Sequence, residues 1–82
     1  MYADYERVWQ EYEQTHDEEY EQLLEWFRES LPQDKIRKDV PEGLQAIFYQ
    51  RMVYWAGRSG TPSLEDLNAF IERYLADKNN NQ

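Results

Sequence analysis

Aromatic and aliphatic side chains recur at steps of three or four residues through positions 2–31 of the chain. The steps average roughly 3.6 residues, which is the period of an α-helix. No glycine or proline interrupts this stretch. The pattern therefore predicts helical structure over residues 2–31, with one stripe packed against the rest of the protein. The members of the stripe are Tyr2, Tyr5, Trp9, Tyr12, His16, Tyr20, Leu23, Phe27 and Leu31.

Residues 15–18 leave open whether this region is one long helix or two helices, over 2–15 and 17–31. Thr15 and Glu18 have the spacing of a capping box, in which each side chain satisfies a backbone N–H of a new helix. Asp17 next to them would favour the positive end of that helix. The unbroken hydrophobic phase argues for one helix, whereas the cap and the compactness of a short chain favour two.

Residues 44–56 are the most hydrophobic part of the chain and carry two apolar stripes at helical spacing. A helix that is apolar on most of its sides is covered by several neighbours. We therefore expect a central helix over 42–56, begun near Pro41 and ended by Gly57 in a left-handed conformation. The first stripe is Leu44, Ile47, Phe48, Met52 and Trp55, and the second is Ala46, Tyr49, Val53 and Ala56.

A one-sided apolar stripe predicts a last helix over 62–77. Its start is marked either by Thr61 followed by Pro62, or by Ser63 with Asp66. Residues 32–41 form a loop between two prolines, with Ile36 and Val40 as its expected anchors and a basic character suited to contact with the acidic N-terminal region. The fold expected is an all-α bundle of three to four helices in one domain, 1–78, followed by a disordered polar tail, 79–82.

The charge is concentrated in the N-terminal third. The net charge is −8, and residues 1–31 hold ten acidic and two basic side chains, whereas 32–82 hold seven of each. Such a field repels nucleic acid and anionic membranes and attracts basic partners. It also keeps an aromatic-rich protein in solution, which is a purely physical role.

The residues needed for several kinds of chemistry are missing. The chain has no cysteine and one histidine, His16, and its serines and glycines form no nucleophile or phosphate-binding motif. We therefore expect no enzyme activity, no cofactor and no metal site. The N-terminal residues do not resemble a secretory signal, and no run is long enough to span a membrane. Together with the lack of cysteine, this indicates a cytoplasmic protein.

One acidic pattern points to a binding face. Asp4, Glu11, Glu18 and Glu25 recur every seven residues beside the aromatic stripe. Carboxylates one or two helical turns apart stand about 5–10 Å apart, similar to the spacing of phosphates along a nucleic-acid strand. We expect this row, edged by Tyr5, Trp9 and Tyr12, to bind a basic surface on a partner protein. In its sharpest form the row imitates DNA and inhibits a nucleic-acid-binding protein.

Two further expectations concern the aromatic stripe and Arg51. The stripe is richer in aromatic residues than one bundle face requires, so the alternative function is self-assembly, with a symmetric homodimer closed across Tyr2, Tyr5, Trp9 and Tyr12. Arg51 lies within the apolar central helix, where its guanidinium either reaches the surface on its long stem or, if buried, requires a partner; we favour the second. We expect a structural ion pair between Arg51 and a carboxylate of the N-terminal region, such as Glu19 or Glu25.

Overall fold

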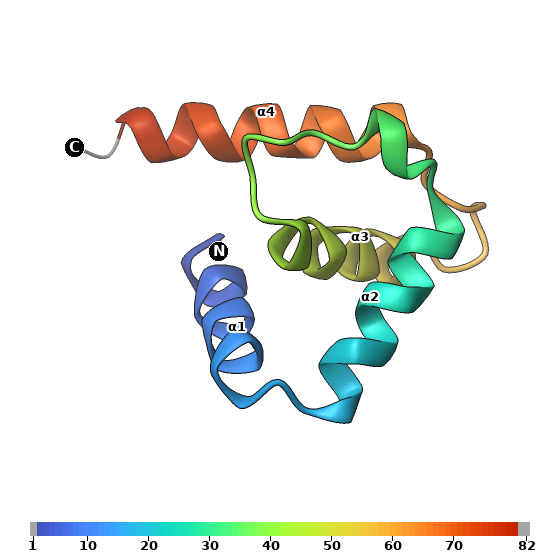
Figure 1. Cartoon of the computed structure of the whole chain (residues 1–82). Coiled ribbons are helices and arrows are strands. Elements are labelled where there is room, and N and C mark those ends of the chain that lie inside the picture. The colour runs from blue at the N-terminus through green and yellow to red at the C-terminus, as the bar shows by residue number, and fades with distance from the viewer. Residues whose placement is uncertain (1, 81–82) are drawn as a thin grey trace.

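The computed structural model describes residues 2–80, and these form four α-helices and no strand. The helices are α1 (Tyr2–Thr15), α2 (Glu18–Ser30), α3 (Glu42–Ala56) and α4 (Leu64–Asn80), with the short 3-10 helix η1 (Gln33–Lys35) between α2 and α3. Figure 1 shows α3 in the centre, with α1 and α2 diverging on one side of it and α4 lying across the other. The predicted small all-α bundle is confirmed.

The N-terminal region is two helices, and the break falls where the sequence allowed it. The capping residue is Asp17, whose Oδ1 accepts from the backbone N–H of Tyr20 at 3.0 Å. The Thr15 hydroxyl instead donates back to the Glu11 carbonyl of α1 at 3.0 Å, so Thr15 is not the cap. Between them His16 has a positive φ of 48° and an exposed side chain, and it therefore turns the chain rather than continuing the stripe.

Helix α3 is buried on all sides only in its first half. Every residue from Gly43 to Tyr49 is buried, because rings of α1, α2 and α4 pack around this half. Beyond it Gln50 and Arg51 are exposed, and Tyr54 and Trp55 are 74% and 75% exposed. The expectation that the apolar stripe stays covered as far as Trp55 is therefore wrong.

Gly43 allows α1 and α2 to meet α3 at one point. A Cβ atom at this position would lie 2.1 Å from the Tyr20 hydroxyl oxygen and 2.8 Å from the Trp9 ring. Only a residue without a side chain fits there. At the other end of α3, Gly57 is the C-cap as predicted, and its positive φ of 55° suits glycine. Its ψ of −116° lies outside the left-handed helical conformation that the sequence predicts.

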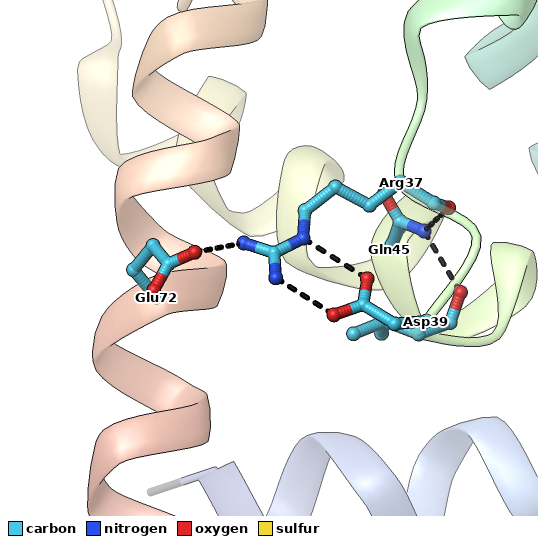
Figure 2. A network of polar contacts seen from close by, with 5 residues as sticks. Arg37, Asp39, Gln45 and Glu72 are labelled. Atoms are coloured by element: carbon cyan, nitrogen blue, oxygen red, sulfur yellow. Dashed lines mark hydrogen bonds and ion pairs between the residues drawn. The ribbon is translucent and has the colours of Figure 1, made fainter.

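The loop before α3 is fastened to α3 and α4 rather than to the acidic N-terminal region (Figure 2). The fully buried amide of Gln45 donates to the carbonyls of Arg37 and Val40, each at 2.8 Å. The Arg37 guanidinium binds Asp39 with two hydrogen bonds and also pairs with Glu72 of α4. This guanidinium lowers the pKa of the Asp39 carboxyl. Ile36 is buried, as is Val40, and both are anchors as predicted.

Helix α4 begins with the second of the two predicted caps. The Ser63 N–H donates to Asp66 Oδ2 at 2.8 Å, and the Asp66 N–H donates to Ser63 Oγ at 3.2 Å. The helix continues to Asn80, beyond the predicted end near residue 77, and residues 81–82 of the predicted tail lie outside the described residues. None of the helices within 2–80 combines the length and apolar character that a membrane crossing requires.

Candidate functional site

The acidic side chains of α2 lie on the side opposite its buried stripe. Tyr20, Leu23, Leu24 and Phe27 are the buried residues of this helix. Residues seven or four positions apart on a helix share a face, so Glu18, Glu25 and Glu29 point together in the opposite direction. All three are exposed, and Glu21 is exposed on the flank of the same face. We call Glu18, Glu21, Glu25 and Glu29 the α2 acidic face.

The negative charge of this face is not neutralised inside the protein. Within residues 2–80, no hydrogen bond or ion pair engages the carboxylates of Glu18, Glu25 or Glu29. Arg28 is the basic residue of α2, but its guanidinium forms an ion pair with Glu42 through two hydrogen bonds of 2.7 and 3.0 Å. This pairing lowers the pKa of Glu42. The carboxylates of Glu18, Glu25 and Glu29 therefore face solvent without a cation of residues 2–80 bound to them.

The outward acids of α1 are placed differently, around a cation of their own helix. Asp4 Oδ1 lies 3.9 Å and Glu11 Oε1 3.8 Å from the Arg7 guanidinium, and all three side chains are 66% exposed. Pairs this exposed contribute little to stability, but they halve the net charge of the group. Asp4 and Glu11 therefore supply a weaker field than the equally spaced acids of α2.

The other two acids of α1 accept hydrogen bonds from buried tyrosines. The Tyr20 hydroxyl donates to Glu13 Oε2 at 2.6 Å, and the Tyr74 hydroxyl donates to Glu6 Oε1 at 2.6 Å. Burial and then the Glu13 bond raise the pKa of Tyr20 to about 12. Burial and Glu6 likewise raise the pKa of Tyr74. These carboxylates attach α1 to α2 and α4 instead of forming a second acidic row.

The predicted seven-residue row is therefore not a single line. Asp4 and Glu11 lie on α1, whereas Glu18 and Glu25 lie on α2, and the two helix axes diverge after the turn at 16–17 (Figure 1). Residues spaced seven apart share a face only if they belong to the same uninterrupted helix. Of the predicted site, the structure keeps Glu18 and Glu25 together and separates Asp4 and Glu11 from them.

The predicted aromatic edge is packed into the protein. The Tyr5 ring meets Phe48 edge-on at 5.7 Å, and the Tyr12 ring stacks on Tyr20 at 5.6 Å. Trp9 lies against Gly43 of α3. Tyr2 also contacts rings of α3 and α4. These rings pack onto the core within one chain and stay partly exposed.

Arg51 is exposed and makes no buried ion pair. Its guanidinium carbon lies 5.9 Å from the centre of the Tyr5 ring, a cation–π contact. No carboxylate of residues 2–80 pairs with it. The expected pair with Glu19 or Glu25 is wrong, because the half of α3 that carries Arg51 is not surrounded by other helices.

An open groove between α3 and α4 was missed at the level of sequence. It has a volume of about 620 Å³, and Trp55 stands at its edge. The sequence gives no clear signal for it, because Trp55 shares an apolar stripe with the buried Phe48. We call this feature the Trp55 groove. Its lining residues are Met52, Trp55, Ala56, Ser59, Gly60, Thr61, Pro62, Asp66, Ala69, Phe70 and Arg73.

Within residues 2–80, no group of three or more histidine or carboxylate side chains is arranged to hold a metal ion. No protein-family model, curated protein or solved structure matches the chain. The functional argument therefore rests on the α2 acidic face.

Proposed function

We propose that this protein is a non-enzymatic protein-binding module whose α2 acidic face binds a basic surface on a partner protein. The observation that supports the proposal is the set of three carboxylates, from Glu18, Glu25 and Glu29, that point away from the core. No cation within 2–80 engages them. The proposal thus moves the centre of the predicted site from both N-terminal helices to α2.

The acids of α1 have a secondary place in this proposal. Asp4 and Glu11 can extend the negative surface, but Arg7 lies between them. The rings of Tyr5, Trp9 and Tyr12 hold α1 in position and do not form the contact itself. We therefore expect substitutions in α2 to weaken partner binding more than equivalent substitutions in α1.

The sharper form of the proposal is inhibition of a nucleic-acid-binding protein by charge mimicry. Helix α2 has 13 residues, which corresponds to roughly 20 Å at 1.5 Å per residue. A nucleic-acid strand of that length carries about six phosphates. A single helix of this size can occupy a short segment of a phosphate-binding groove, and the divergence of α1 prevents a longer continuous row.

The same charge distribution is the basis for the remaining parts of the proposal. A net charge of −8 disfavours direct contact with nucleic acid or anionic membranes. The lack of cysteine fits a reducing compartment, so we place the protein in the cytoplasm. Exposed charges act mainly on the association rate, and binding through them weakens as salt screens the field.

The test is a pull-down from a lysate at low and high salt with the variant Glu18→Gln/Glu25→Gln/Glu29→Gln. We expect the partner captured by the wild type at low salt to be lost from the triple variant. The matched control is Asp34→Asn/Glu65→Gln/Asp77→Asn, which removes the same charge from exposed positions outside α2. Retention of the partner by the α2 variant, or equal loss in both variants, would rule out the α2 acidic face as the binding surface.

A further inference from the structure

A second open hollow lies beside the α2 acidic face, where α2 meets α1 and α3. Its volume is about 400 Å³, which falls within the range of roughly 300–1,000 Å³ that is typical of ligand pockets. We call it the Trp26 pocket. The α2 part of its lining has the i, i+3, i+4, i+7 spacing of one helix face, and α1 and α3 contribute one residue each. The lining residues are Tyr12, Glu19, Gln22, Leu23, Trp26 and Gln50.

The lining of the Trp26 pocket carries a negative charge that no cation of the lining offsets. Glu19 is the charged residue among those that line it, and neither lysine nor arginine is present there. Glu19 is exposed, and no hydrogen bond or ion pair within residues 2–80 engages its carboxylate. The side-chain amides of Gln22 and Gln50 likewise make no hydrogen bond in this part of the chain, so their oxygens can accept from an occupant. These acceptors together favour a cation that has several N–H donors.

Two aromatic rings bound the pocket, and each packs against a buried ring of the core. Trp26 is tilted against Tyr49 with 5.4 Å between the ring centroids, and Tyr12 stacks on Tyr20 at 5.6 Å. Both core rings are buried, so the two outer rings are held in place before a partner arrives, which lowers the entropic cost of binding. The buried Leu23 adds apolar surface between the polar groups. An aromatic face of this kind attracts a cation that lies over it.

We propose that the Trp26 pocket binds an arginine side chain on the basic surface of the partner protein. A guanidinium is planar and carries five N–H donors, so it can stack on the Trp26 ring while it donates to the Glu19 carboxylate and to an amide oxygen. A lysine ammonium has three donors and no flat face to stack. The methylene groups of the arginine can lie against Leu23, and Tyr12 limits the pocket on the side of α1.

This inference rests on the proposed function, because it takes a basic partner of α2 as given and names the side chain that the partner inserts. Gln22 is four positions from Glu18 and three from both Glu19 and Glu25, so it lies where the pocket meets the α2 acidic face. Exposed carboxylates act mainly on the association rate, whereas a side chain held in a pocket acts on the lifetime of the complex. The pocket thus fixes the position of the partner along α2.

The test follows the isotope-labelled full-length protein by NMR at low salt while the peptide acetyl-Gly-Arg-Gly-amide is added. We expect the indole N–H signal of Trp26, assigned with the variant Trp26→Phe, to shift until the pocket is saturated. The indole signals of Trp9 and Trp55 should stay in place, because these residues do not line the pocket. The same peptide with lysine in place of arginine should bind about two- to fivefold more weakly, since it loses the stacked guanidinium.

The variant Glu19→Gln should weaken binding of the arginine peptide by about two- to fivefold, which is the contribution of one exposed ion pair. Its matched control is Glu65→Gln, since Glu65 is an exposed acid in the first turn of α4 as Glu19 is in the first turn of α2. The control should bind as the wild type does. Gln50→Arg places a guanidinium of the chain itself at the pocket and should abolish the Trp26 shift. All three positions are exposed, and circular dichroism checks that the fold persists.

Three results would overturn the arginine pocket. They are a Trp26 signal that does not move, equal affinities for the two peptides, and equal affinities of Glu19→Gln and Glu65→Gln for the arginine peptide. Each of them leaves the proposed function intact, because capture of a partner by the α2 acidic face is measured separately with Glu18→Gln/Glu25→Gln/Glu29→Gln. Failure of the proposed function is seen when that triple variant retains the lysate partner, whatever the peptide does.

Discussion

Helices α1 and α2 have the same spacing of aromatic and acidic residues, but the folded protein uses them in different ways. Helix α1 has no fully buried residue among those described, whereas α2 buries Tyr20, Leu23, Leu24 and Phe27. The carboxylates of α1 either accept hydrogen bonds from tyrosine hydroxyls or lie beside the Arg7 guanidinium. The carboxylates of Glu18, Glu25 and Glu29 on α2 point outward without a hydrogen bond or ion pair in 2–80.

The difference shows that amphipathic spacing reports which side of a helix faces the protein, not how deeply that side is buried. Depth depends on how many other elements converge on the same side. Rings of α1 cover the outside of a core built by α2, α3 and α4, so their edges remain half exposed. Phe27 of α2 contacts Tyr49 in the centre of that core and is fully buried.

The largest expected effect on stability is the difference between removing Phe27, a buried core ring of α2, and removing Tyr5, a half-buried ring of α1. Phe27→Ala should reduce the free energy of unfolding by about 3–5 kcal/mol, because it leaves a cavity in a fully buried position. Tyr5→Ala should cost about 1–2 kcal/mol, since its ring is only half buried. Urea denaturation of both variants measures the contrast, and equal losses would show that α1 belongs to the core as fully as α2 does.

The second prediction concerns the point where both helices meet α3. Gly43→Ala gains up to about 1 kcal/mol of helix propensity, but overpacking costs about 1–3 kcal/mol. The new Cβ atom would lie 2.1 Å from the Tyr20 hydroxyl and 2.8 Å from the Trp9 ring, which is closer than atoms pack. We therefore expect the cost of overpacking to exceed the gain in helix propensity, so that Gly43→Ala lowers the free energy of unfolding. Adding Tyr20→Phe removes the closest atom and should recover part of that loss. Thermal denaturation of the two single variants and the double variant tests this. If the stability losses of Gly43→Ala and Tyr20→Phe simply add in the double variant, the new side chain at position 43 does not clash with the Tyr20 hydroxyl.

The third prediction tests the link between α1 and α2 through Tyr20. Its folded-state pKa is about 12 and its ordinary value is 10.0, so the unfolded chain ionises first as the pH rises. The stability that neutral Tyr20 contributes is therefore present below pH 10.0 and is lost as the pH rises toward 12.

Tyr20→Phe should make the alkaline loss of stability less steep, as measured by urea unfolding at several pH values across this window. The loss should not disappear, because burial also raises the pKa of Tyr49 and of Tyr74. An unchanged alkaline slope in Tyr20→Phe would show that this hydroxyl does not hold the two helices together.

The smallest expected effect is at Arg51, which reaches α1 only through the Tyr5 ring. An exposed cation–π contact contributes about 0.5–1 kcal/mol, so Arg51→Ala and Arg51→Met should both melt close to the wild type. In a Tyr5→Leu background the effect of Arg51→Ala should vanish. A large loss in Arg51→Ala that Arg51→Met avoids would restore the idea of a buried charge that needs a partner.

The helices could be predicted from sequence because their signals are local. The bounds of α1, α2 and α3 follow from periodicity, from Pro41 and Gly57, and from the cap residues near 15–18. The choice of Asp17 over Thr15 could not be predicted, because both side chains are able to cap and the outcome depends on the turn at His16.

The candidate site was only partly predictable. Glu18 and Glu25 are exposed as expected, since carboxylates opposite an apolar stripe face water. The Trp55 groove was hidden because Trp55 and Phe48 share one stripe of the sequence, whereas only Phe48 meets rings from other helices. Periodicity assigns both residues to one side of α3 and gives no information about where the neighbouring helices stop.

The sequence by itself determined that this chain forms short amphipathic helices with its negative charge gathered at one end, because propensity, period and capping act within a few residues. Only the tertiary structure decided which half of α3 is covered, which acids are occupied by tyrosines, and which charges remain free. Those outcomes depend on the angles at which the helices cross, and the angles are set by contacts between residues far apart in the chain, such as Glu6 with Tyr74 and Gly43 with Trp9. The divergence of α1 from α2 converted one predicted acidic row into a single acidic helix.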